Sequence, residues 1–139
     1  MSRDEFIKAY IDFTQTAIPL AIKARREGLL ALGADVDGGK AGRRDIFHYG
    51  LHFAVNGFAP EIIDKILSNI IAQETDDYTR TFKIIQKEAV MGIQASDNPF
   101  ILSCMLNSYT DIPVKDAPFP DEDWPDLPAD GDSEQKETQ

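Results

Sequence analysis

The sequence predicts an all-α fold, a small helical bundle or hairpin of about five helices that is followed by a disordered acidic tail. Apolar residues recur at spacings of three and four in successive segments, which is the pattern of helices that bury one face. Residues that favour helix starts and ends separate these segments. No segment shows the strict alternation of apolar and polar residues that indicates a half-buried strand.

Charge divides the 139 residues into a helical domain, residues 1–110, and a tail, residues 111–139. The chain has a formal net charge of −10, and the tail alone contributes −8, because it holds ten of the 24 acidic residues and only two lysines. The domain is therefore close to neutral, so a nucleic-acid partner is not expected. The tail also holds five of the eight prolines, a composition that cannot bury a core and that predicts disorder.

The first helix is expected to begin near residue 3, because Ser2 and Glu5 have the spacing of a capping box. Pro19 lacks a backbone donor and predicts a kink or a restart of this helix. The continuation holds the run KARREGLLALG, residues 23–33, and we expect Gly33 to end it as a left-handed C-cap. Residues 34–44 are rich in glycine and charge and predict a mobile loop. The packing face of the first helix is formed by Phe6, Ala9, Tyr10, Phe13, Ala17 and Leu20.

Proline, glycine and short polar residues mark the remaining helices. A helix is expected over residues 45–55, with Gly57 as its C-cap. Pro60 suits the first turn of the next helix, whose apolar stripe continues for roughly thirty residues and predicts the longest helix of the fold. The run SDNP, residues 96–99, is expected to start the last helix, with its aspartate or asparagine as the cap and its proline as the first helical residue.

The sequence also predicts where the protein is located. No apolar stretch approaches the roughly 20 residues that a membrane-spanning helix needs, and the N-terminus lacks the apolar segment of a secretory signal. We therefore expect a soluble, cytoplasmic protein without a membrane span. The single cysteine, Cys104, cannot form an internal disulfide and lies in an apolar helical pattern, which predicts a small core residue.

Few residues suggest chemistry. His48 and His52 stand one helical turn apart, a spacing that can present two imidazoles to one metal ion, but two ligands do not close a site and a surface pair is the simpler interpretation. There is no glycine-rich phosphate loop, nucleophile elbow or spaced cysteine–histidine pair. We therefore expect no enzymatic activity and no catalytic, cofactor or metal site. Phe119 and Trp124 are either incidental aromatics of the tail or a short motif that docks in a basic, apolar groove.

Separated stretches of the chain resemble one known family. The runs LAIKARREGLLALG, residues 20–33, and IFHYGLHFAVNGFAPEIIDKIL, residues 46–67, are similar to the cytoplasmic region between the second and third membrane helices of the MotA family. These proteins are the flagellar stator A-subunits of the MotA/TolQ/ExbB proton-channel group. The run KEAVMGIQASDNPFILSCMLNSY, residues 87–109, resembles the family's segment after its fourth membrane helix. The resemblance extends over residues 15–109.

The resemblance implies a charged contact surface without a channel. The four membrane helices of the family are absent, and a proton path needs a continuous lining across the bilayer, so this chain is not expected to conduct ions. In the family an arginine and a glutamate flank the REGLLAL run and face the rotor's switch protein. The arginine corresponds to Arg25, whereas the glutamate position falls on Gly33. Asp35 and Asp37 lie nearby in a glycine-bearing stretch and do not take over the role.

The last helix departs from the family as well. Phe100 stands where the family usually has arginine, and residues 103–105 stand where it usually has charge. This extra apolar surface predicts that the helix packs inside a bundle or against a partner.

Together these features predict a non-catalytic, soluble MotA-like protein. We expect it to bind flagellar motor components, either the rotor switch protein or stator subunits, through Arg25, Arg26 and Glu27. Any association with a membrane is expected to be peripheral, through a membrane-bound partner, and the oligomeric state is left open. The alternative is a structural or regulatory module with no role in motility, which the loss of the acidic residue at Gly33 favours. A metal-dependent enzyme built on the histidine pair is a third candidate.

Overall fold

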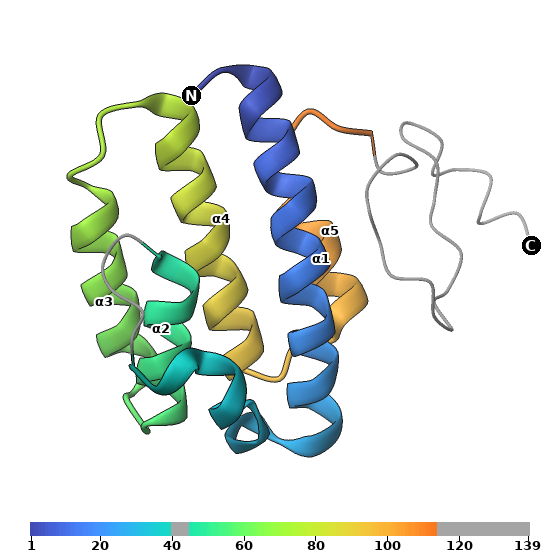
Figure 1. Ribbon diagram of the computed structural model, residues 1–139, viewed down its shortest axis with the longest axis vertical. Helices are drawn as coiled ribbons and strands as arrows, with labels where there is room; N and C mark the ends of the chain where they lie inside the picture. Colours follow the sequence, from blue (N-terminus) through green and yellow to red (C-terminus); the bar gives the residue numbers. More distant parts are fainter. Residues whose placement is uncertain (40–44, 114–139) are drawn as a thin grey trace, which may run out of the picture.

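The computed structural model describes residues 1–39 and 45–113, and every regular element in this part of the chain is a helix (Figure 1). The elements are α1 (Arg3–Glu27), the 3-10 helix η1 (Leu29–Gly39), α2 (Ile46–Val55), α3 (Pro60–Ile71), α4 (Asp77–Gln94) and α5 (Pro99–Asn107). The predicted all-α class is confirmed, with a 3-10 helix beside five α-helices. From residue 114 onward, the predicted disordered tail lies outside the described residues.

Helix α4 forms the centre of the bundle. It contacts α1, α2, α3 and α5, and its inner face is fully buried at Ile85, Ala89 and Val90. In Figure 1, α4 runs beside α1, with α2 and α3 on one flank and α5 behind α1. Helix η1 packs against α1 and α2 and closes the end of the bundle that is drawn at the bottom. The core therefore lies between α4 and the helices that surround it.

Two glycines allow close approach to neighbouring helices around α4. A Cβ atom at Gly50 of α2 would lie 2.9 Å from Leu67 Cδ1 and 2.9 Å from Val90 Cγ2. A Cβ atom at Gly92 of α4 would lie 2.6 Å from Leu102 Cδ1 of α5. These separations are shorter than the roughly 3.5–4.0 Å of a favourable carbon–carbon contact. Glycine at both positions therefore allows the observed close packing of α2 and α5 on α4.

The starts of α1 and α4 lie next to each other and are fixed by side-chain caps. The predicted capping box is present, because the Glu5 amide donates to Ser2 Oγ at 3.1 Å and the Ser2 amide donates to Glu5 Oε1 at 2.7 Å. Asp76 caps α4 by accepting from the Thr79 amide at 2.9 Å, and it also accepts from the Thr79 hydroxyl at 2.7 Å and from the Met1 ammonium group at 2.9 Å. These donors lower the pKa of Asp76 to about 2. The resulting stabilisation is present above pH 4 and is lost as the pH falls towards 2.

Helix α1 continues without interruption through Pro19, so the predicted restart there is wrong. Ile18 and Ala21 are buried on either side of the proline. Most helical stability in proteins comes from the packing of an apolar face, and here the packing outweighs the missing hydrogen-bond donor. The resulting helix has 25 residues and is the longest of the described part of the chain.

The single long helix predicted after Pro60 is also wrong, because residues 72–76 separate α3 from α4. Glu74 stabilises this break. Its carboxylate accepts from the Asp76 amide at 3.0 Å and from Lys83 Nζ at 2.9 Å, and its carbonyl accepts from Arg80 Nη2 at 2.8 Å. The apolar stripe is nevertheless continuous in sequence because its two halves pack against each other as a helical hairpin.

We predict that Gly50→Ala destabilises the fold, although alanine favours a helix by about 1 kcal/mol over glycine. The added methyl group would meet Val90, whose β-branched side chain has little rotamer freedom, and overpacking of this kind costs roughly 1–3 kcal/mol. The urea midpoint should fall by an amount equivalent to about 1 kcal/mol. Gly33→Ala is the matched control, because a Cβ atom there meets nothing within 4 Å. Equal midpoints for the two variants would contradict the close packing at Gly50.

Candidate functional site

Helix α1 ends at Gly28 and not at Gly33, so the predicted C-cap is wrong. Gly28 has a φ of 95° and a ψ of 155°, a conformation that is essentially restricted to glycine, and its amide donates to the Ala24 carbonyl at 2.8 Å. Gly33 lies within η1 and has no positive φ. Both glycines follow apolar helical residues, and sequence spacing did not distinguish them. Residues 34–39 belong to η1 where a mobile loop was expected, and residues 40–44 lie outside the described residues.

The three residues predicted to bind a partner lie together in the last turn of α1. Arg25, Arg26 and Glu27 are all exposed. Arg25 Nη1 donates to the carbonyl oxygen of Ser96, in the turn between α4 and α5, at 3.4 Å. Positive charge in the last turn of a helix is also favoured by the helix dipole, by about 0.3–1 kcal/mol at exposed positions. The arginines therefore have a local stabilising role besides any role in binding.

Three segments meet at this end of the bundle, drawn at the bottom of Figure 1. The Arg25 contact brings the end of α1 to the α4–α5 turn, where Ser96 has a left-handed φ of 58°. Gln94 Nε2 donates to the Phe58 carbonyl at 2.9 Å and joins the end of α4 to the turn between α2 and α3. We call this end, formed by residues 24–33, 56–62 and 94–101, the basal end.

The basal end combines charge with exposed apolar side chains. Leu30 is 76% exposed, Ile101 62%, Ile62 48% and Phe58 39%. Protein interfaces commonly have apolar residues at their centre and polar residues at their rim. Arginines beside exposed aliphatic and aromatic side chains therefore make the basal end a candidate protein-binding surface.

Gly33 faces open space at the basal end. No atom lies within 4 Å of the position that its Cβ atom would take, and its backbone conformation is one that other residues adopt. Asp35 is partly buried and forms an ion pair with Lys23, with 3.0 Å between Asp35 Oδ2 and Lys23 Nζ. The carboxylate of Asp35 is thus used to hold η1 against α1. The side chain of Asp37 lies outside the described residues.

Several residues of the motifs that resemble the MotA family pack or cap helices in this structure. Gly50 and Gly92 permit close helix packing, and Pro60 and Pro99 occupy the first turns of α3 and α5. Of the two caps that the sequence offered, Asp97 and Asn98, the structure has Asn98, which caps α5 by accepting from the Phe100 amide at 2.8 Å. By contrast, the arginines and the glutamate of the first motif are exposed and are not needed to fill the core.

The histidine pair is not joined by a third ligand. His48 Nδ1 lies 2.9 Å from Asp45 Oδ2, and Asp45 also caps α2 by accepting from the His48 amide at 3.1 Å. His52 Nδ1 lies 3.5 Å from the side-chain nitrogen of Asn56. Within residues 1–39 and 45–113, no group of three or more histidines, cysteines and carboxylates could hold a metal ion. Cys104 is only partly buried, and burial raises the pKa of its thiol.

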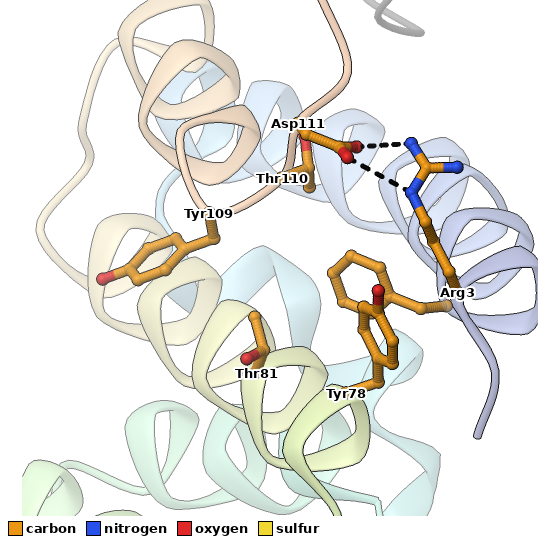
Figure 2. Close-up of a pocket in the computed structure, with 7 residues that line it drawn as sticks. Arg3, Tyr78, Thr81, Tyr109, Thr110 and Asp111 are labelled. Carbon is orange, nitrogen blue, oxygen red and sulfur yellow. Dashed lines mark hydrogen bonds and ion pairs between the residues drawn. The ribbon is translucent and has the colours of Figure 1, made fainter.

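A cleft that no sequence pattern indicates lies at the opposite end of the bundle (Figure 2). Arg3 donates two hydrogen bonds to the Asp111 carboxylate, at 3.2 and 2.8 Å, and the rings of Phe6 and Tyr78 lie 5.2 Å apart between centroids. No local pattern connects Arg3 to a residue 108 positions away. We call this space of about 300 Å³ the upper cleft; it is lined by Arg3, Phe6, Tyr78, Thr81, Tyr109, Thr110 and Asp111.

Comparisons with protein families, curated proteins and solved structures find no match for this chain. The resemblance to the MotA family therefore stays a prediction from sequence motifs. Among residues 1–39 and 45–113, no helix has the length and apolar character needed to cross a membrane.

We predict that Gly28→Ala destabilises the protein by roughly 1–3 kcal/mol, because a Cβ atom is strained in this backbone conformation. Gly33→Ala serves again as the control, since its backbone accepts any L-residue, and it should leave stability unchanged or slightly raised. Urea unfolding of both variants measures the difference. If Gly33→Ala were the more damaging substitution, α1 would end at Gly33 and the position assigned to the charged turn would be wrong.

Proposed function

We propose that this chain is a non-catalytic, MotA-like protein that binds flagellar motor components, the rotor switch protein or stator subunits, and does not itself conduct ions. The observation that carries the proposal is the division of the motif residues into two sets. One set packs helices or caps them. The other set, Arg25, Arg26 and Glu27, is exposed at the basal end, where Arg25 also donates to the Ser96 carbonyl, and it matches the part of the family motif that faces the rotor.

The chemistry of the basal end supports a protein partner with acidic groups. Two neighbouring guanidinium groups can form charge-assisted hydrogen bonds with carboxylates. Such charges at an interface mainly set the association rate and the orientation of the partner. Leu30 and Ile101 add exposed apolar surface to the same end. On this proposal the protein acts in the cytoplasm, and any membrane association is peripheral, through a membrane-bound partner.

A second candidate is a structural or regulatory module that has no role in motility. Gly33 favours it, because the family's acidic residue is missing at a position where the fold has open space for a side chain. A chain selected to contact the rotor would be free to keep an acid there.

We predict that Arg25→Glu combined with Arg26→Glu reduces the recovery of motor proteins in pull-downs from a flagellated host by tenfold or more, equivalent to about 1.4 kcal/mol. Charge reversal would place like charges against the acidic partner. The matched control is Lys8→Glu with Lys65→Glu, which makes the same change in net charge at exposed positions outside the basal end. Equal losses in both variants, or retention of motor proteins by the arginine variant, would contradict the assignment of this surface.

We further predict that Gly33→Glu increases recovery of the rotor switch protein several-fold without loss of stability. The substitution restores the acidic partner at an open position of η1. Ala34→Glu adds the same charge at the next exposed residue and should have a smaller effect. A gain for neither variant favours the module without a role in motility, whereas an equal gain for both indicates a general charge effect and contradicts the motif alignment.

A further inference from the structure

The upper cleft is lined by three aromatic rings, two threonines and the Arg3–Asp111 ion pair, whose charges satisfy each other. Phe6 is 4% exposed, whereas Tyr78 and Tyr109 keep 37% and 40% of their surface exposed. Figure 2 shows the two tyrosines on different sides of the cleft, with Thr81 between them. Grooves lined by aromatic rings bind proline-rich segments, because an extended proline segment has little conformational entropy to lose and its rings pack on aromatic faces. The cleft therefore suits a short, uncharged, proline-containing peptide.

The described chain ends directly beside this cleft. Asp111 lines it, and the described residues stop at Pro113. The run APFP, residues 117–120, starts four positions later and contains two prolines, one phenylalanine and no charge. Four residues of extended chain span roughly 12–14 Å, which is enough to bring this run over a cleft whose wall is two residues from Pro113. Attachment by so short a tether gives an effective concentration in the millimolar range, so weak contacts suffice.

We propose that residues 117–120 of this chain bind in its own upper cleft, with Pro118 and Pro120 packed against the rings of Tyr78 and Tyr109. This inference does not depend on the proposed function. It gives a role to the proline-rich start of the tail and to two tyrosines that the helical core leaves exposed.

The charges at this end of the bundle leave the uncharged run as the segment that fits the cleft. Asp76 is paired with the Met1 ammonium group, Asp77 with Arg80 and Asp111 with Arg3. Residues 121–139, in contrast, carry eight acidic residues and one lysine, so any contact that they make depends on salt. Packing of proline rings on tyrosine rings depends little on ionic strength, so docking in the upper cleft should persist as salt is raised. A tail held by the arginines of the basal end would be released by added salt.

The test is nuclear magnetic resonance spectroscopy on the full chain, with nuclear Overhauser effects measured between the tyrosine rings and proline protons. We expect these effects between Tyr109 and Pro118 or Pro120, and we expect them to persist at high salt. Pro118→Ser combined with Pro120→Ser should shift the ring signals of Tyr78 and Tyr109 while the amide signals of the helical core stay in place. Pro125→Ser with Pro128→Ser is the matched control and should leave both the effects and the ring signals unchanged. Tyr109→Ser, at an exposed position, should weaken the effects between Tyr78 and the same prolines.

Several outcomes would overturn the proposal. One is the absence of these effects in the wild-type chain, and another is a set of Tyr78 and Tyr109 ring signals that the Pro118→Ser, Pro120→Ser variant leaves unchanged. Isotope-filtered spectra that assign them to contacts between two molecules would show that a second copy's tail occupies the cleft. If tail substitutions shift the signals of Arg25 and Arg26 and salt removes that shift, the tail binds the basal end and not the upper cleft.

Discussion

The close approach of α2 and α5 to α4 is the constraint on which the rest of the structure depends. Glycine at positions 50 and 92 allows it, because a Cβ atom at either position would meet the core within 3 Å. This close approach positions the α2–α3 and α4–α5 turns at the basal end. Gln94 bonds to the first of these turns and Arg25 to the second. The candidate binding surface is therefore a consequence of helix packing at two positions that carry no side chain.

Features decided by neighbouring residues were predicted from the sequence. The capping box at Ser2, the cap at Asn98 and the turn at Gly57, whose φ is 86°, each depend on residues a few positions apart. The errors concern competition between local and tertiary effects. Helix α1 continues through Pro19 because the residues around the proline are buried. The apolar pattern after Pro60 is continuous in sequence, but the hydrogen bonds of Glu74 stabilise a turn that divides it into two helices.

The two candidate sites differ in how far sequence could predict them. The charged turn of α1 was predicted because its three residues are consecutive and carry a motif, and the structure adds that they are exposed beside apolar side chains from two other turns. The upper cleft could not be predicted, because Arg3 and Asp111 are brought together only by the path of the whole bundle. The sequence also does not show that Tyr78 and Tyr109 line the same cleft.

The two ends of the bundle have opposite character, and this affects what the tail can do. Along α1, Arg3 of the upper cleft and Arg25 of the charged turn are about 33 Å apart. With residues 117–120 bound in the upper cleft, the start of the acidic run would be held at this distance from Arg25 and Arg26. Docking of the tail would therefore lower the effective concentration of the chain's own acids at the basal end and reduce their competition with a partner.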